Sequence, residues 1–199
     1  MKKMAYWLLL ACAISILHLS VQPSAANEYE KDHSGWLEEF GLLTGYGGAS
    51  IVGGNYQLVL FMPRWGFDIK PATEKMGLKP PGHLEFVVEP LANVVVSPNT
   101  NAEVGCSFLL KYGLDLAHRF LVFAEGGLGM LYMTQHTVEQ GTQYNFLPQG
   151  GAGVQYFFNK RWALTGSYRF RHLSNAGISS RNSGINTHLA LVGISFFYK

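Results

Sequence analysis

The chain has 199 residues, of which 48% are hydrophobic, 14% are aromatic and only 14% are charged, and its formal net charge is +2. This length suits a single domain, and the apolar content is too high for a disordered chain. The near-neutral charge balance argues against a nucleic-acid partner. Charged residues make up about 25% of a typical soluble protein, so the low fraction here indicates that part of the surface faces lipid instead of water.

Residues 1–26 have the features of an export signal. Two lysines precede an apolar stretch over residues 4–19, and small residues suit cleavage after Ala26. The apolar stretch is shorter than the roughly 20 residues that a membrane-spanning helix needs. We therefore predict a signal peptide over 1–26 and one mature domain over 27–199.

The chain from Trp36 onward is dominated by segments typical of strands. These segments, roughly 10–15 residues long and rich in aromatic and β-branched side chains, are separated by clusters of Gly, Asn, Pro and Ser. We place eight strands at 36–47, 55–69, 83–96, 104–114, 119–132, 143–158, 162–174 and 186–198. The mature chain has no run of about 18 apolar residues, so a helical membrane protein is excluded. The pattern predicts an all-β fold, an eight-stranded antiparallel transmembrane β-barrel.

The connections between these segments differ in length. Those at 115–118 and 159–161 are tight, whereas the segments after Ser97, Met133 and Ser174 are longer and more polar. Outer-membrane barrels have short periplasmic turns and longer extracellular loops. If the first strand runs outward, both tight connections fall at the periplasmic end, as required. The connection over residues 70–82 is too long for a simple turn, and the sequence leaves open whether it is a short helix or a plug.

The segment 162–174 shows the clearest alternation. Its even positions are mostly apolar or aromatic, while its odd positions are small or polar and include Arg169 and Arg171. Because successive side chains of a strand point to opposite faces, the segment has one apolar and one polar face. A soluble barrel would turn the apolar face inward, whereas an eight-stranded membrane barrel turns it toward lipid. The low charge content favours the membrane barrel. The two arginines can then pair inside it with Glu38, Glu85, Glu89 or Glu125.

The same segment ends in residues that can carry chemistry. His172 and Ser174 lie two positions apart and therefore share one strand face, which brings a base near a hydroxyl nucleophile. This face is the apolar one, so the pair faces lipid at the outward end of the strand. If the last strand begins near Asn186, then Asn186 and His188 lie beside the pair. Spacing alone does not separate a catalytic pair from polar residues at a membrane interface.

Around this pair the sequence reads His-x-Ser-Asn-Ala-Gly over residues 172–177 and Asn-x-Gly-Ile-Asn over residues 182–186. The motif resembles that of the PagL-type lipid A 3-O-deacylases, outer-membrane enzymes of Gram-negative bacteria. The resemblance implies an eight-stranded barrel in the outer membrane, with its active site on the outer-leaflet surface. It also implies that His172 is the general base and Ser174 the nucleophile.

The resemblance implies further roles for the residues after the nucleophile. It assigns the oxyanion site to Asn175, Gly177 and Asn182. The best-known members carry a glutamate that orients the histidine, and Asn186 occupies its position here. An amide can hold an imidazole by a hydrogen bond, as in Cys-His-Asn enzymes, but it adds no full charge. His188 and Glu139 are further candidates for this third role.

The sequence therefore predicts an outer-membrane esterase that removes the 3-O-linked acyl chain of lipid A, the anchor of lipopolysaccharide, by a Ser/His mechanism. Arg181 is a candidate contact for a phosphate of that lipid. No organic cofactor is implied, and the absence of a Cys cluster or a His pair at ligand spacing argues against a metal.

Other functions are compatible with the same pattern. A non-enzymatic structural or adhesion barrel needs only the strands, and a palmitoyltransferase-like barrel would add a chain to lipid A. A soluble lipocalin-like binder would invert the two faces of the sheet. The sequence does not specify the preferred acyl-chain length or whether the protein forms a homodimer.

Overall fold

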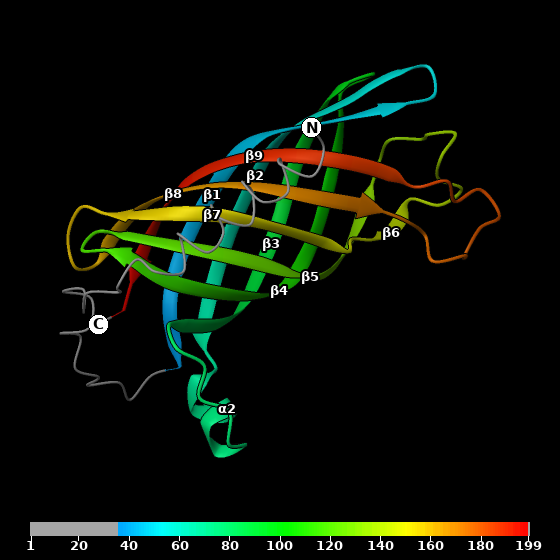
Figure 1. Ribbon diagram of the computed structural model, residues 1–199. Coiled ribbons are helices and arrows are strands. Elements are labelled where there is room, and N and C mark those ends of the chain that lie inside the picture. Colours follow the sequence, from blue (N-terminus) through cyan, green and yellow to red (C-terminus); the bar gives the residue numbers. More distant parts are fainter. Residues whose placement is uncertain (1–35, 199) are drawn as a thin grey trace, which may run out of the picture.

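The computed structural model of the protein describes residues 36–198, so the predicted signal peptide over 1–26 lies outside the described residues. Nearly all of the described chain forms one curved sheet (Figure 1). The strands are β1 (Leu37–Ile51), β2 (Gly54–Asp68), β3 (His83–Ser97), β4 (Asn101–Ala117), β5 (Phe120–Met133), β6 (Tyr144–Phe146), β7 (Gln149–Phe157), β8 (Trp162–Leu173) and β9 (Ile185–Phe197). Between 36 and 198, no helix has the length and apolar character to cross a membrane.

The sheet closes on itself. Antiparallel pairing runs from strand to strand around the wall, and β1 pairs with β9 over ten residue pairs from Glu39–Phe197 to Gly48–His188. The short β6 and the longer β7 both pair with β5, so together they form one stave of the wall. Closure leaves no unpaired strand edge, which is what a lipid environment requires. The predicted eight-stranded antiparallel barrel is confirmed.

The stave formed by β6 and β7 corrects the continuous strand predicted over 143–158. The break falls at Leu147 and Pro148, where Leu147 turns fully into the lumen and exchanges two backbone hydrogen bonds with Gly129. Proline has no backbone N–H and therefore cannot continue the ladder. The carbonyl oxygen of Pro148 instead accepts a hydrogen bond from the backbone N–H of His172. The break thus lies directly beside the predicted catalytic segment.

The structure answers one question about the connections that the sequence left open and corrects one prediction. Residues 70–82 contain the short helix α2 (Lys70–Lys75), which projects away from one end of the barrel instead of plugging it (Figure 1). The segment after Ser97 is shorter than predicted, because β3 and β4 extend further and only residues 98–100 join them. We call the end that carries α2 the inner end and the opposite end, which carries the β8–β9 loop, the outer end.

The two faces of the barrel wall are chemically opposite. On β8, Arg169 and Arg171 are each 1% exposed, whereas Tyr168 and Phe170 between and beside them are 52% and 39% exposed. A soluble protein buries its aromatic rings and exposes its guanidinium groups. The inverse arrangement means that the outer face of the wall lies against lipid.

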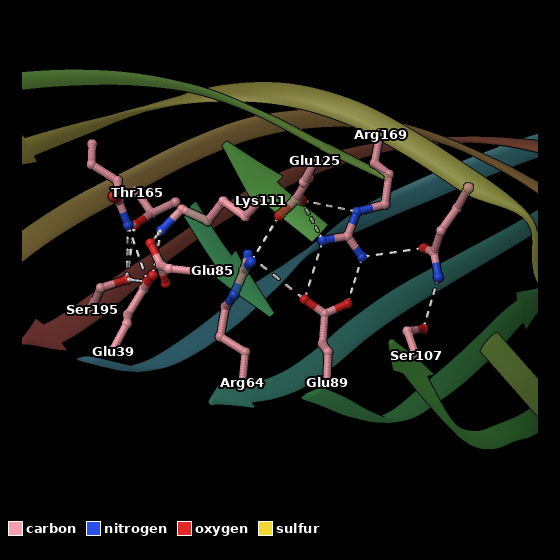
Figure 2. Close-up of polar contacts among 12 residues, drawn as sticks. Glu39, Arg64, Glu85, Glu89, Ser107, Lys111, Glu125, Thr165, Arg169 and Ser195 are labelled. Atoms are coloured by element: carbon pink, nitrogen blue, oxygen red, sulfur yellow. Dashed lines mark hydrogen bonds and ion pairs between the residues drawn. The ribbon is translucent and has the colours of Figure 1, made fainter. Parts of the chain in front are cut away.

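The inner half of the lumen is filled with paired charges (Figure 2). Arg169 donates to Glu125 through Nη2 (2.6 Å) and to Glu89 through both terminal nitrogens. Arg64 donates to the second oxygen of Glu125 at 2.7 Å. A second group lies next to it, in which the Lys111 ammonium donates to Glu39 and to Glu85. Such pairs compensate for the loss of hydration inside the wall.

The predicted partners of the two β8 arginines are right for one and wrong for the other. Arg169 binds two of the expected carboxylates, but Arg171 binds Glu103, with an Nη1–Oε2 distance of 2.8 Å. Glu38 pairs with neither arginine in the described chain, and its carboxylate lies 3.6 Å from a ring nitrogen of His83 near the inner end. The stagger between strands sets which residues meet across a lumen, and the sequence alone does not provide it.

Beside the Arg171–Glu103 pair, the outer half of the lumen also holds an apolar cluster, which the expected polar interior did not include. Its fully or nearly buried members come from several strands and include Leu43, Leu58, Leu60, Met62, Val95, Leu131, Leu147, Leu173 and Ile185. Leu173 is the last residue of β8 and Ile185 is the first of β9. The β8–β9 loop is therefore anchored at both of its ends in an apolar core.

Replacing Arg169 by leucine should destabilise the barrel strongly, because Glu89 and Glu125 would lose their shared partner inside the wall. Removing one member of a buried ion pair costs about 3–5 kcal/mol. The measurement is the urea midpoint of unfolding in detergent micelles, with folded and unfolded protein separated by gel mobility. Arg119→Leu, in the exposed β4–β5 turn, is the matched control and should leave the midpoint near that of the unchanged protein. Equal midpoints for the two variants would contradict the proposed importance of the charge network.

Candidate active site

The end of β8 presents His172 and Ser174 on the outer face of the wall. Leu173 between them is fully buried in the lumen, and alternation along the strand therefore turns both neighbours outward. The backbone of Ser174 exchanges two hydrogen bonds with that of Phe146, with N–O distances of 3.1 and 2.7 Å. Both residues thus lie on backbone that is fixed by a neighbouring stave.

Asn186 lies opposite His172 in the pairing of β8 with β9. Its side-chain oxygen Oδ1 is 2.6 Å from Nδ1 of the imidazole. An amide oxygen can only accept, so Nδ1 carries the hydrogen of this bond. In a neutral imidazole the other nitrogen, Nε2, is then the acceptor and can take a proton from a hydroxyl group.

Gly184 closes the other side of the imidazole. Its φ is +80°, and a Cβ built on it would lie 2.3 Å from Cε1 and 2.9 Å from Nε2 of His172. Both the left-handed backbone and the lack of space exclude a larger residue. The ring is therefore held by a hydrogen bond at Nδ1 and by backbone contact beside Nε2. Sequence reasoning missed this role, since the motif shows the glycine but not what it touches.

The turn after Ser174 is held together by the side chain of Asn175, which is fully buried. Its amide nitrogen donates to the carbonyl oxygen of Arg181 at 2.8 Å, and its oxygen accepts from the backbone N–H of Gly177 at 3.0 Å. Ala176 adopts a left-handed φ of +50°, which is uncommon for a residue other than glycine. Mildly strained backbone of this kind is frequent at functional sites.

Asn182 binds the same turn from the far end of the loop. Its Oδ1 accepts from the backbone N–H of Asn175 at 2.8 Å, so the two asparagines hold the loop closed. The backbone N–H groups of Asn175 and Gly177 are thus already paired within the loop. The amide nitrogen of Asn182, in contrast, has no hydrogen-bond partner among residues 36–198 and remains a donor.

The other two candidates for the third role lie elsewhere. His188 faces outward two residues further along β9, with Nδ1 2.6 Å from the hydroxyl oxygen of Tyr168. Glu139 is buried in the loop between β5 and β6, where its carboxylate accepts from the backbone N–H of Val52 at 2.5 Å. Of the three candidates, Asn186 is the one that the structure brings into hydrogen-bond contact with His172.

The loop between β5 and β6, residues 134–143, is part of the site's surroundings that sequence reasoning missed. The side chain of Gln140 donates to the carbonyl oxygen of Leu173 at 3.2 Å, and its backbone bridges to Asn182. The loop is polar and irregular, so no periodic pattern marks it as a support for the β8–β9 loop.

This arrangement has the parts of a nucleophilic acyl-transfer site: a hydroxyl, an oriented imidazole and a loop with an unpaired amide donor. Over residues 36–198, no group of three or more histidine, cysteine or carboxylate side chains is placed to hold a metal ion. All of these parts lie on the outer face of the wall, at its outer end.

Comparisons with solved structures relate this fold to several barrels. The outer membrane enzyme PagL superposes with a TM-score of 0.60 at 16% identity, over 78% of this chain and 97% of that one. Neisserial surface protein A superposes with a TM-score of 0.61 at 13% identity, over 80% of this chain and 96% of that one. The N-terminal barrel domain of Pseudomonas aeruginosa OprF gives 0.50 at 12% identity, over 81% and 98%. At these identities the likeness is one of fold.

Comparison with curated protein sequences gives no match. The family model described as lipid A 3-O-deacylase (PagL), however, matches residues 29–195, which is most of the chain and includes every residue of the candidate site. The chain therefore belongs to the PagL family of lipid A 3-O-deacylases.

Proposed function

We propose that this protein is an outer-membrane esterase that hydrolyses the ester between lipid A and its 3-O-linked acyl chain at the outer-leaflet surface. The observation that carries the proposal is the bond between His172 and Asn186 on the lipid-facing wall, beside the outward-facing Ser174. A site on this face meets an ester of a membrane lipid without drawing the lipid out of the bilayer. Membership of the PagL family supports the same substrate.

The proposed reaction has two halves. Nε2 of His172 takes the proton of the Ser174 hydroxyl as Oγ attacks the ester carbonyl carbon, and the carbonyl oxygen becomes an oxyanion. Collapse of this intermediate breaks the bond to the sugar oxygen, which receives the proton from His172. Water then attacks the acyl-enzyme with the same histidine as base, and the fatty acid leaves while Ser174 regains its proton.

Asn186 has a positioning role in this proposal. Its oxygen keeps the hydrogen of the imidazole on Nδ1 and so leaves Nε2 directed to accept a proton. A glutamate would add a charge that stabilises the imidazolium, and an asparagine does not. On a surface that faces acyl chains, however, a neutral amide avoids the cost of a second exposed charge.

For the oxyanion, the proposal assigns donation to the side chain of Asn182, because the backbone N–H groups of Asn175 and Gly177 are already paired within the loop. The unpaired Nδ2 of Asn182 is the available donor. Asn175 has a positioning role, because it bonds both to the side chain of Asn182 and to the carbonyl oxygen of Arg181. Arg181 is assigned to the polar part of the substrate. A single oxyanion donor is worth about 3 kcal/mol in comparable sites.

Ser174→Ala and His172→Ala should each abolish deacylation while the barrel stays folded, because each removes a group that takes part in bond making. Mass spectrometry of lipid A from cells expressing each protein checks this, with heat-modifiable gel mobility as the folding control. Ser167→Ala, on the same strand but with a buried hydroxyl that has no partner in the described chain, is the matched control and should retain activity. Deacylation by Ser174→Ala would falsify the nucleophile assignment. Unchanged lipid A, or lipid A that gains a palmitate, with the unaltered protein would instead favour the structural or palmitoyltransferase alternatives.

Asn186→Ala should reduce deacylation partly, by roughly 10- to 100-fold, because a hydrogen bond of about 1–3 kcal/mol that orients the imidazole is lost. Asn186→Glu should retain the activity or raise it, since a carboxylate accepts the same bond. Initial rates on purified lipid A in detergent micelles measure both. If neither substitution changes the rate, another residue orients His172.

Gly184→Ala should lower the deacylation rate by more than about tenfold, because its Cβ would displace an imidazole on which a shift of roughly 1 Å matters. Gly53→Ala in the β1–β2 turn is the matched control: its φ is +88° but nothing lies within 4 Å of the added Cβ. Both variants carry similar backbone strain, about 1–2 kcal/mol. Equal deacylation rates for the two variants would show that contact with His172 does not matter.

A further inference from the structure

A small polar cavity lies between the β5–β6 loop and the β8–β9 loop. Its volume is about 120 Å³, and its walls are formed by Gln135, His136, Thr137, Gln140, Gly141, Thr142, Gln143 and Arg181. The lining contains amides, hydroxyls, one histidine and one arginine, and it contains neither a carboxylate nor a large apolar side chain. At about 30 Å³ per water molecule, the volume suits a phosphate group or one edge of a sugar ring. An acyl chain would find no apolar wall here.

Two groups of the lining lack partners. Gln140 is only 4% exposed, and its side-chain oxygen accepts no hydrogen bond within the described residues. A buried acceptor left in this state costs free energy unless a ligand supplies a donor. The guanidinium of Arg181 is exposed, and among residues 36–198 it has no hydrogen-bond or ion-pair partner. A ligand with one negative charge and one hydroxyl or amide donor would satisfy both groups.

The cavity shares its backbone with the candidate active site. The carbonyl oxygen of Arg181 accepts from the backbone N–H of Gly141 and from the side chain of Asn175, both at 2.8 Å. Gln140 in turn donates to the carbonyl oxygen of Leu173, the residue before the nucleophile. A group held in the cavity is therefore fixed relative to Ser174 through one or two residues of backbone.

Contact between the two loops depends on the small size of Gly141. A Cβ at this position would lie 2.0 Å from Oγ and 2.7 Å from Cβ of Ser179. The β5–β6 loop is also fixed at its other contacts, since Gln135 accepts from Asn101 at 2.7 Å and Glu139 accepts from Val52. The cavity is therefore formed before any ligand arrives, which favours specific binding.

We propose that this cavity binds the phosphorylated sugar head of the lipid substrate. Arg181 and His136 hold one phosphate, and the free oxygen of Gln140 accepts a hydrogen bond from a hydroxyl or amide of the sugar. The head group then lies among the outer loops while the acyl chains lie along the wall, which places the ester between them at Ser174. This inference rests on the proposed function and extends it from the ester to the head group.

The test compares purified lipid A carrying its phosphates with the same lipid A after dephosphorylation, as substrates of the folded full-length barrel in mixed micelles. We expect the unaltered protein to prefer the phosphorylated lipid by at least about tenfold in kcat/KM, mainly through KM, as charge-assisted hydrogen bonds predict. Arg181→Gln and His136→Gln should lose most of this preference. Arg119→Gln, at the inner end of the barrel, should keep it.

Equal rates of the unaltered protein on the two lipids would overturn the proposal. The same result is expected if the cavity binds only free inorganic phosphate and not the phosphate of the lipid. So would Arg181→Gln and His136→Gln proteins that slow down equally on both lipids and keep the preference. Binding of the two lipids to the Ser174→Ala protein, measured by native mass spectrometry, requires no turnover. A phosphate preference there, without hydrolysis by the unaltered protein, would support the head-group site and overturn the esterase.

Discussion

Successive side chains of β8 point alternately into the lumen and toward lipid, and this alternation places the candidate chemistry. Leu173 turns into the apolar cluster of the lumen, and its neighbours His172 and Ser174 therefore turn outward. Ile185 does the same on β9 and so turns Asn186 outward beside the imidazole. A shift of one residue in either strand would carry these side chains into the lumen, where no ester of a membrane lipid can reach them. The apolar core at the outer end thus acts on the site through the direction of its side chains as well as through stability.

Between its two ends, which are anchored in the apolar cluster, the loop that follows β8 is held by asparagine side chains. The side chain of Asn182 accepts from the backbone N–H of Asn175, and the side chain of Asn175 donates to the carbonyl oxygen of Arg181. The side-chain amide nitrogen of Asn182 is left unpaired among the described residues. A second loop, residues 134–143, supports the first through Gln140 and Gly141. Rigidity of this kind is what an oxyanion site needs, because donors that are already oriented cost no reorganisation during the reaction. The same two loops enclose the polar cavity, so the support of the reacting centre and the proposed recognition of the head group are parts of one structure.

Much of this architecture could be predicted from the sequence, and the parts that could not have a physical reason. The alternation in 162–174 identified the lipid-facing side of β8, and the eight segments matched the staves of the wall. The pairing of Arg171 with Glu103 and the roles of Arg64 and Lys111 depend on the stagger between strands, which no local pattern encodes. For the site, the motif brought out His172, Ser174 and Asn186, but the contact of Gly184 with the imidazole arises from a loop conformation. The cavity arises from two loops 40 residues or so apart in the chain, and neither has a periodicity that predicts its neighbour.

The interior of the barrel also has a bearing on the permeability of the membrane that contains it. Ion pairs run through the lumen as far as the Arg171–Glu103 pair, and leucine, methionine and isoleucine side chains pack beside that pair toward the outer end. A solute crossing through the lumen would have to separate guanidinium and carboxylate groups and displace the apolar side chains packed beside them. The barrel can therefore present the candidate site on its lipid-facing wall without opening a path for solutes through the membrane.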